Sequence, residues 1–408
     1  MRMPTPPDLL IRRGAVPTEF IPKAKPDRSL GNLPPGFAAA DLEIRAGHIH
    51  TIAPALASFT HSVLDAQNCL ILPGFIDVHV HGSAGFDTMD ASAPALAGLA
   101  HFFAQHGVTT FLPTTMTSSH ANTLRAVTAV ANQPSHSLNG ARIAGVHLEG
   151  PYLSPHYPGA QRADYIRPPN LAELRELLAA SLVRLITLAP EEPGAAALIG
   201  EALRNNVRVV LGHTNASYEV CEAAIAAGVS QATHTFNAMS GLHHRRPGTL
   251  GAVLSNDAIY AQLIADNIHV HPAAIKILAR CKGVARIILI TDAIRATGMP
   301  DGQYDLGGQR VTVEAGECRL ADGTLAGSIL TMERALFNFM AASGLSLAEA
   351  WPTTSRTPAQ ALGWGHERGE ILPNYHADLV LLDQTLQVVA TIVEGNVVYL
   401  REPARLVQ

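Results

Sequence analysis

Apolar, β-branched runs alternate with alanine- and leucine-rich stretches from residue 73 onward. This alternation is typical of βαβ units, in which parallel strands are joined by helices. Eight apolar runs can be distinguished, and they begin at Phe75, Thr109, Arg142, Val183, Val207, Gln231, Tyr260 and Arg286. Because eight parallel strands close into a barrel, the pattern predicts an α/β fold with a (β/α)8 barrel of the TIM type.

Helices are expected between several of these runs, at residues 93–105, 195–205, 218–227 and 272–282. Gly228 and Gly283 follow the last two, and glycine is the usual residue where a helix ends in a left-handed turn. Pro272 is the first residue of the fourth helix. A backbone N–H at that position would have no partner within the helix, so proline, which lacks it, is favourable there.

The two ends of the chain show a different pattern, of short alternating strands separated by turn residues. We expect residues 1–72 and 373–408 to build one small β-sandwich domain beside a barrel domain of residues 73–372. Within the small domain, the proline-dense stretch of residues 21–36 is expected to form a surface loop.

A further segment follows the eighth run, which is the last expected barrel strand. Residues 298–327 are rich in glycine and in short polar β runs, and a helix is predicted after them over residues 328–342. Barrel enzymes carry their sites at the C-terminal ends of the strands, so this excursion is expected near the active-site face.

Composition narrows the possible classes of function. With 47% hydrophobic and 15% charged residues, the chain is typical of a compact globular protein. A formal net charge of −5 argues against general affinity for nucleic acids or anionic membranes, since both need basic surfaces. No apolar stretch approaches the ~18 residues of a membrane span. Four cysteines without a C-x-x-C spacing are typical of a reduced compartment, so we expect a cytoplasmic protein.

Histidine pairs of the form His-x-His occur three times in the chain. With 19 histidines in 408 residues, about one such pair is expected by chance, so the pattern alone is weak evidence. His48 and His50 fall in the terminal β domain, and we interpret them as structural. His79 and His81 lie at the end of the first barrel run, where two rings on the same side of a strand can meet one ion. The third pair begins at His269.

At least six of the eight runs carry a histidine or an acidic residue near the C-terminal end. Glu149 ends the third run with a carboxylate suited to Zn²⁺, Fe²⁺ or Mn²⁺ and able to bridge two ions, although it could also cap a helix or pair with a lysine. His213 and His234 end consecutive runs, so we expect their rings to lie side by side as ligands. Asp292 ends the eighth run and could exchange a proton with a metal-bound water, or simply cap the next element.

These motifs together resemble the N-acetylglucosamine-6-phosphate deacetylase family of the amidohydrolase superfamily. The resemblance is carried, in order over roughly residues 70 to 400, by PGFIDVHVHG, HLEGP, GHT, THTFNAM, HHRRPG, TDA and TLAGSILTM. It implies a metal-dependent (β/α)8 barrel, a small β-sandwich formed by both chain ends, and a homodimer.

The resemblance also implies roles for individual residues. Glu149, His213 and His234 would hold the principal metal, while His79 and His81 match members that can hold a second ion. The cofactor is then one or two divalent ions per subunit, Zn, Fe or Mn. Asp292 would be the general base and acid.

Substrate contacts implied by the resemblance are Gln161, Asn237, Ala238, Arg245, His269, Leu325, Ala326 and Gly327. Arg245 and His269 resemble a phosphate-binding pair, with the arginine reaching across the dimer. The residues themselves also predict a phosphate pocket, because His243 to Arg246 form the only dense cationic cluster of a net acidic sequence and arginine suits phosphate oxygens. Arg246 and His243 are expected to face solvent. Asn267 stands where the family commonly has glycine, and asparagine tolerates positive φ.

The reaction implied by the family is hydrolysis of N-acetylglucosamine 6-phosphate to glucosamine 6-phosphate and acetate, with a hydroxide on the metal as nucleophile. Three alternatives remain open. One is an N-acetylgalactosamine-6-phosphate deacetylase, and another is a different amidohydrolase, although cyclic amidases usually have a carboxylated lysine in place of Glu149. The third is a non-catalytic protein that binds sugar phosphates.

Overall fold

The computed structural model describes residues 8–21, 33–57, 62–133 and 139–407. Outside the described residues lie 22–32 of the predicted surface loop, 1–7, 58–61 and 408 of the predicted terminal domain, and 134–138 of the predicted barrel domain.

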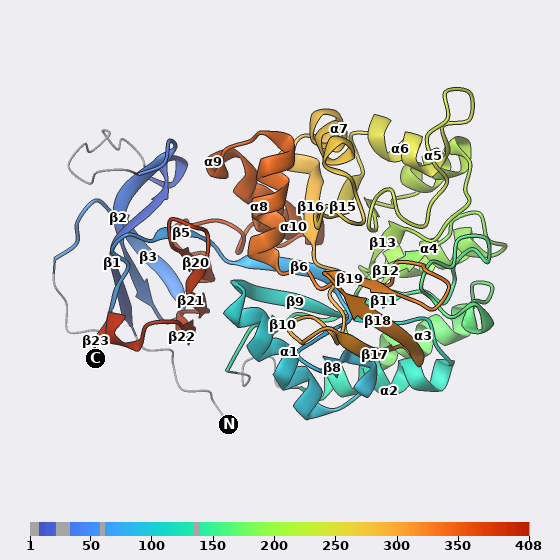
Figure 1. The fold of residues 1–408 in the computed structure, drawn as a ribbon, viewed down its shortest axis with the longest axis horizontal. Coiled ribbons are helices and arrows are strands. Elements are labelled where there is room, and N and C mark those ends of the chain that lie inside the picture. The colour runs from blue at the N-terminus through green and yellow to red at the C-terminus, as the bar shows by residue number, and fades with distance from the viewer. Residues whose placement is uncertain (1–7, 22–32, 58–61, 134–138, 408) are drawn as a thin grey trace.

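A closed barrel of parallel strands forms the centre of the molecule (Figure 1). Its strands are β6 (Phe75–Val80), β9 (Val108–Thr115), β10 (Arg142–Ile143), β11 (Val146–Glu149), β12 (Val183–Leu188), β13 (Arg208–Leu211), β14 (Gln231–Ala232), β15 (Tyr260–Ile264) and β16 (Ile287–Ile290). The short β10 and β11 both pair with β9 and together correspond to the third predicted run. The prediction of an eight-stranded barrel is confirmed.

Backbone hydrogen bonds between the first and last strand positions close the barrel. Asp292 N–H donates to His79 O at 2.9 Å, and His81 N–H donates to Ala293 O at 2.8 Å. Every residue of β9, β11 and β16 is buried, as expected of parallel strands covered on both faces. The line along which β6 meets the chain after β16 is the seam of the barrel, and His79, His81 and Asp292 lie on it.

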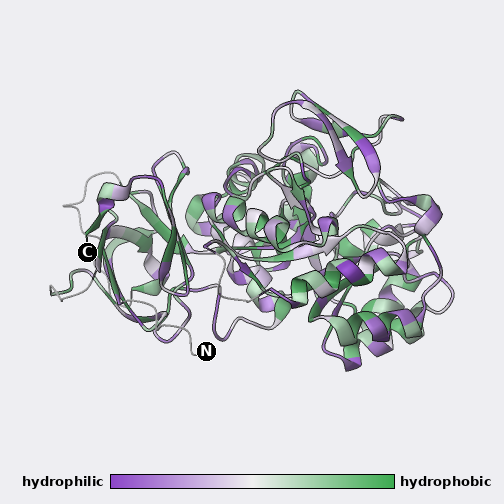
Figure 2. Ribbon diagram, turned by 90° about the horizontal axis from the view of Figure 1, so that it is seen from below, coloured by the Kyte–Doolittle hydropathy of each residue, from purple (hydrophilic) through white to green (hydrophobic). Residues whose placement is uncertain are grey.

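Helices surround the barrel, and in Figure 2 they carry alternating hydrophilic and hydrophobic segments, as amphipathic helices do. They are α1 (Ala93–Gln105), α2 (His120–Ala131), α3 (Leu171–Ala180), α4 (Ala195–Arg204), α5 (Tyr218–Ala226), α6 (Gly248–Ser255), α7 (Pro272–Lys282), α8 (Met332–Ser343), α9 (Leu347–Ala350) and α10 (Arg356–Leu362). The predicted bounds of α1, α4, α5 and α7 agree within one residue. Gly228 and Gly283 have φ of +112° and +63°, which explains why glycine stands at these helix ends. No helix of the described residues is long and apolar enough to cross a membrane.

Both chain ends contribute to one mixed sheet beside the barrel (Figure 1). Its strands are β1 (Leu9–Pro17), β2 (Phe37–Arg45), β3 (His48–Ala53), β4 (Ser62–Asp65), β5 (Leu70–Pro73), β20 (Leu379–Leu382), β21 (Val388–Val393), β22 (Asn396–Leu400) and β23 (Leu406–Val407). β5 joins the two ends, because it pairs parallel with β1 and antiparallel with β20. The exact limits of the two domains stay predictions.

The excursion after β16 forms a three-stranded antiparallel sheet of β17 (Gly302–Leu306), β18 (Gln309–Glu314) and β19 (Glu317–Arg319). The following helix, α8, begins at Met332 and not at Ser328 as predicted. Backbone pairing explains the difference, since Ser328 N–H donates to Asp292 O and Ser328 O accepts from Ile294 N–H. Ser328, the first residue of the expected helix, therefore pairs with the backbone at the barrel seam and not with a helix.

A buried cation holds the terminal sheet to the segment that follows α10. Arg368 is 4% exposed in its side chain and contacts the carboxylates of Asp378 and Glu394, of which Asp378 is only 6% exposed. Asp378 also accepts a hydrogen bond from the backbone N–H of Glu394 at 2.8 Å. A buried charge is stable only while an opposite charge lies beside it, so the Asp378 carboxylate depends on the Arg368 guanidinium.

Replacing Arg368 with methionine should lower the free energy of unfolding by about 3–5 kcal/mol, because Asp378 would stay buried without its cation. Urea denaturation followed by circular dichroism measures the change. Arg175→Met is the matched control, since Arg175 pairs with Glu201 at the surface with 62% of its side chain exposed, and it should change the midpoint little. Equal midpoints for the two variants would contradict the prediction.

Candidate functional site

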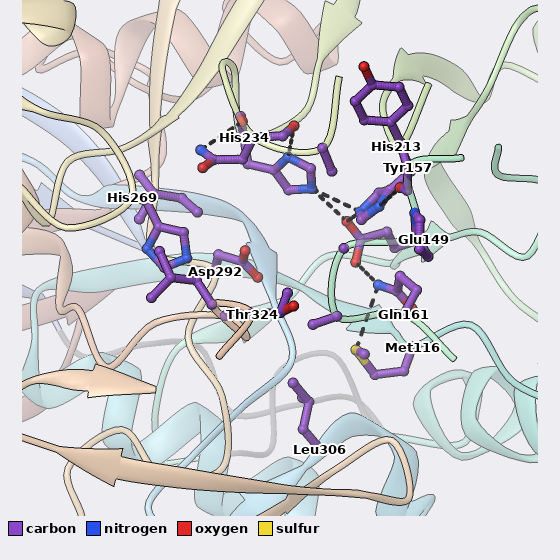
Figure 3. A pocket seen from close by; sticks show the side chains of 18 of the residues that line it. Met116, Glu149, Tyr157, Gln161, His213, His234, His269, Asp292, Leu306 and Thr324 are labelled. Atoms are coloured by element: carbon purple, nitrogen blue, oxygen red, sulfur yellow. Dashed lines mark hydrogen bonds and ion pairs between the residues drawn. The ribbon is translucent and has the colours of Figure 1, made fainter. Parts of the chain in front are cut away.

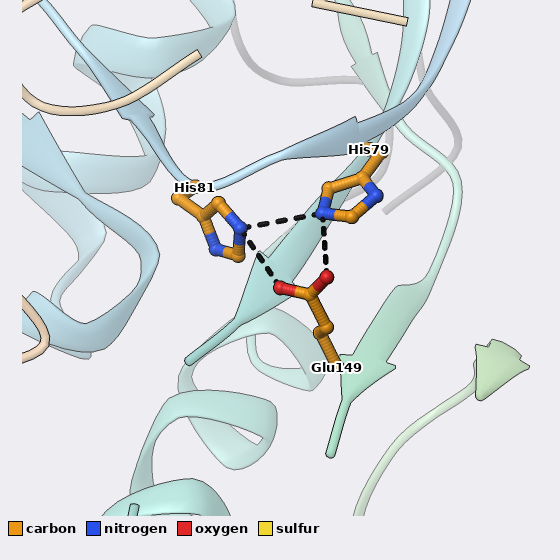
Figure 4. A group of neighbouring side chains, drawn as sticks. All are labelled: His79, His81 and Glu149. Atoms are coloured by element: carbon orange, nitrogen blue, oxygen red, sulfur yellow. Dashed lines mark hydrogen bonds and ion pairs between the residues drawn. The ribbon is translucent and has the colours of Figure 1, made fainter. Parts of the chain in front are cut away.

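Six titratable side chains converge at the C-terminal mouth of the barrel (Figures 3 and 4). They come from the ends of β6, β11, β13, β14 and β16, and they are His79, His81, Glu149, His213, His234 and Asp292. His213, His234 and Asp292 have φ of +48°, +26° and +50°. Non-glycine residues in this left-handed region cost of order 1–3 kcal/mol each, and such strain clusters at functional sites. The backbone is thus bent at three strand ends that carry these side chains.

Glu149 lies at the centre of this group and contacts two pairs of histidines. Its Oε1 is 3.2 Å from Nε2 of both His213 and His234, and 3.4 Å from Nε2 of His79. Its Oε2 is 3.2 Å from Nε2 of His81 (Figure 4). Two triads capable of holding a metal therefore share one carboxylate, His79–His81–Glu149 and Glu149–His213–His234.

Each of the four histidine rings is held from behind through its Nδ1. The partners are the hydroxyl of Thr233 for His79, the carbonyl of Thr114 for His81, that of Tyr157 for His213 and that of Asn237 for His234, at 2.9–3.2 Å. A carbonyl only accepts, so in His81, His213 and His234 a hydrogen lies on Nδ1, and in the neutral ring Nε2 presents a lone pair to the site. The Thr233 hydroxyl donates to Gln262 Oε1 at 3.1 Å, so it accepts from His79 Nδ1 in the same way. The Nε2 atoms of His213 and His234 are 3.1 Å apart, and those of His79 and His81 are 3.3 Å apart. Facing lone pairs at such distances fit a cation that they share.

The charges of the site also favour a cation. Burial lowers the pKa of His81, but hydrogen bonds with Asp292 and Glu149 outweigh it and raise this pKa to about 10. Burial raises the pKa of Asp292, but His79 and His81 outweigh it and hold it below its usual range. The two buried carboxylates therefore stabilise positive charge between them, which is either a proton on His81 or a bound cation in its place. Imidazole nitrogens with carboxylate oxygens are a donor set that suits Zn²⁺, Fe²⁺ and Mn²⁺.

A cavity of about 350 Å³ opens beside the candidate ligands (Figure 3). Of the predicted substrate contacts, those that line it are Gln161, Asn237, Ala238, His269, Leu325 and Gly327. Ala326 is fully buried, and its N–H donates to Cys318 O at 3.0 Å, so it lies behind the lining. Arg245 is exposed on the loop before α6 and is not among the residues lining the cavity. Within one subunit, the structure does not bring Arg245 to the site.

His269 is held at the edge of the cavity by a neighbouring carboxylate. Its Nδ1 lies 2.7 Å from Asp266 Oδ2, and Asp266 Oδ1 accepts the backbone N–H groups of Ile268 and His269, both at 2.8 Å. Asn267 has φ of +66°, a conformation that asparagine tolerates. The turn expected with glycine is thus formed with asparagine.

The remaining His-x-His residues lie apart from the site. His48 belongs to the terminal sheet and stacks with His376, with ring centroids 4.5 Å apart. His271 caps α7, because its Nδ1 accepts from Ala273 N–H at 3.1 Å. Another buried histidine, His147, is occupied on both nitrogens, by Val78 O at 3.0 Å and by the hydroxyl of Thr187 at 2.8 Å. Burial lowers the pKa of His147 well below its usual value, as expected of a neutral structural ring.

Several cavity residues had no signal in the sequence analysis. Met116, Tyr157, Leu306 and Thr324 line the cavity (Figure 3). Met116 directly follows β9, so the strand-end rule places it here, but a thioether carries no catalytic signature. Leu306 comes from the excursion, and its position depends on how β17 folds over the barrel mouth. The excursion was expected near this face, and it contributes to the wall.

The chain and the structure both resemble proteins of known activity. The sequence matches the amidohydrolase family over residues 70–398. It is 41% identical over 359 residues to the N-acetylglucosamine-6-phosphate deacetylase of Lysinibacillus sphaericus, covering 88% of this chain and 92% of the relative. It is also 41% identical over 357 residues to the N-acetylgalactosamine-6-phosphate deacetylase of Escherichia coli O157:H7, covering 87% and 93%.

Among solved structures, the fold matches that of an aspartate-to-alanine variant of N-acetyl-D-glucosamine-6-phosphate deacetylase from Mycobacterium smegmatis, in complex with N-acetyl-D-glucosamine-6-phosphate. The TM-score is 0.85 at 31% identity, and the match covers 97% of this chain and all of the other.

Removing bound metal with a chelator should lower the free energy of unfolding, because an ion that binds only the folded chain stabilises it. At free Zn²⁺ one hundred times the dissociation constant, the difference should be about 2.7 kcal/mol. Urea titrations with and without Zn²⁺ measure it. Ca²⁺, which prefers oxygen ligands, is the control and should restore little. Stability that is the same with and without Zn²⁺ would contradict a metal site here.

Proposed function

The chain belongs to the N-acetylglucosamine-6-phosphate deacetylases of the amidohydrolase family, and we propose that it removes the acetyl group from N-acetylglucosamine 6-phosphate. The products would be glucosamine 6-phosphate and acetate. One observation carries the proposal: two buried His/Glu triads share Glu149 and face the Asp292 carboxylate beside a cavity of about 350 Å³.

Glu149, His213 and His234 would hold the principal ion, and His79 and His81 would hold a second one together with Glu149. The donor sets and their burial support this assignment. A bound Zn²⁺, Fe²⁺ or Mn²⁺ supplies Lewis acidity, which polarises an amide carbonyl and lowers the pKa of a water.

Asp292 is the proposed general base and acid. Its Oδ1 lies 3.3 Å from His81 Nε2 and 3.5 Å from His79 Nε2, so it faces the space between the two triads. Its lowered pKa keeps the carboxylate ionised at neutral pH, which is the form that accepts a proton from water. The same carboxyl group then returns that proton to the leaving amine of the sugar.

The sugar phosphate would lie in the cavity, against Asn237, Ala238, His269, Leu325 and Gly327. Ala326 would support the last two from behind. Arg245 would complete the phosphate site from the second subunit of a homodimer, which its exposed position within one subunit permits. We place the enzyme in the cytoplasm, and its four cysteines, all free, support this.

A second candidate is the galactosamine epimer of the same substrate. The relative from Escherichia coli O157:H7 named for it is as similar to this chain as the relative from Lysinibacillus sphaericus named for the glucosamine compound, at 41% identity each. The two sugars differ in the orientation of one hydroxyl group, so both fit the chemistry of the site.

Metal-replete protein should release acetate from N-acetylglucosamine 6-phosphate, and coupled acetate detection measures kcat/KM. Parallel assays with N-acetylgalactosamine 6-phosphate decide the epimer, and we expect the glucosamine compound to have the higher kcat/KM. No acetate from either sugar, in folded protein that binds metal, would contradict the proposed function and favour a protein that only binds sugar phosphates.

The matched control for this assay is Asp292→Asn, which keeps the size of the side chain. It should lower kcat roughly 10²–10⁴-fold, the usual contribution of a general acid–base. A folded, metal-loaded variant with full turnover would remove Asp292 from the mechanism.

Arg245→Ala should raise KM for the sugar phosphate roughly 10–100-fold with little change in kcat, since a charge-assisted hydrogen bond to phosphate would be lost. Arg246→Ala is the matched control, because Arg246 is expected to face solvent. Mixed dimers of Arg245→Ala and Asp292→Asn subunits test the interface. If the arginine acts across it, the subunit with intact Asp292 receives Arg245 from its partner, and the low KM returns. Mixed dimers that keep the high KM would place Arg245 in its own subunit's site or outside it.

A further inference from the structure

The side-chain amide of Gln161 contacts the Glu149 carboxylate and holds one of its two oxygens, Oε2. Its Nε2 donates to Glu149 Oε2 at 2.6 Å, whereas Oε1 of the same carboxylate faces His213 and His234 (Figure 3). Glu149 Oε2 thus lies between the Gln161 amide and His81 Nε2. Each oxygen of Glu149 consequently has its own set of partners.

The amide of Gln161 can take only one orientation. Its Oε1 accepts the backbone N–H of Thr117 at 2.7 Å, and an N–H can only be satisfied by the oxygen end. Its nitrogen must therefore face Glu149. That nitrogen also approaches Met116 Sδ at 3.8 Å, a weak acceptor, so both amide hydrogens have partners in the protein.

Gln161 is also held rigidly. Gln161 is only 6% exposed, and its backbone N–H donates to Pro158 O at 2.9 Å. Thr117, whose N–H orients the Gln161 amide, also contacts the end of β11, because its hydroxyl donates to the backbone carbonyl of Glu149 at 3.2 Å. A small closed network therefore connects the end of β9, the loop that carries Gln161, and Glu149.

We infer that Gln161 is a positioning residue for Glu149, and not mainly a hydrogen-bond donor to the substrate. The terminal torsion of a glutamate is broad, so a carboxylate without such a partner can rotate about it. With the amide in place, Oε1 is directed to His213 and His234, and Oε2 is directed to His81. Gln161 thereby sets the metal affinity of the site before any sugar binds. This inference deepens the proposed function and relies on it only for the presence of a metal.

The test measures metal binding without sugar. Metal-free wild type and Gln161→Leu are titrated with Zn²⁺ against a chromophoric chelator. Gln161→Leu should bind Zn²⁺ roughly 10–100-fold more weakly, as is typical when the hydrogen-bond partner of a ligand is removed. Leu306→Ala is the matched control, since Leu306 lines the same cavity but carries no ligand atom and is not a proposed substrate contact, and its Zn²⁺ affinity should equal that of wild type.

Thr117 N–H loses its acceptor in Gln161→Leu, so folding is checked by near-UV circular dichroism. Gln161→Asn is the second variant: it keeps an amide but is one methylene too short to join Thr117 to Glu149, and we expect a smaller loss of Zn²⁺ affinity. Wild-type or tighter Zn²⁺ binding in folded Gln161 variants would overturn the inference, and a raised KM for the sugar phosphate in the same variants would make Gln161 a substrate contact. Wild type that binds Zn²⁺ but releases no acetate would contradict the proposed function alone.

Discussion

The arrangement of the site depends on one buried carboxylate that is shared by two pairs of imidazoles. Glu149 has a single negative charge, yet its two oxygens contact His213 and His234 on one side and His81 on the other. Burial raises the pKa of Glu149, but His79, His213 and His234 outweigh it and hold it well below its usual range, so the group is ionised. A buried charge of this kind is stable only while its partners remain in place.

The surrounding structure can be understood as support for that carboxylate. The histidine rings are held through their far nitrogens by backbone carbonyls and one threonine hydroxyl, which leaves the near nitrogens free. Left-handed backbone at His213, His234 and Asp292 is the conformational cost of directing these side chains into the barrel mouth. The apolar strands beneath make this cost tolerable, because they hold the strand ends in fixed positions.

Much of this could be predicted from the sequence, for a physical reason. Strand ends of a parallel barrel meet at one face, so Glu149, His213, His234 and Asp292 could be placed together without knowledge of any contact. The different partners of the two Glu149 oxygens could not be predicted, because they depend on the Gln161 amide, whose neighbours Met116 and Thr117 directly follow another strand, β9. The burial of Ala326 and the late start of α8 escaped prediction likewise, since both follow from backbone pairing at Cys318 and Ser328.

The seam of the barrel has a consequence for the order in which this protein is assembled. His79 and Asp292 meet through a backbone hydrogen bond although 213 positions separate them along the chain. Contacts between such distant residues have a higher loop-closure cost than local contacts, which slows their formation. A chain still missing its last barrel strand would therefore present His79, His81 and Glu149 without Asp292. The same docking event that closes the barrel brings Asp292 against His79 and His81, so the proposed acid–base residue joins the proposed ligands only once the barrel is closed.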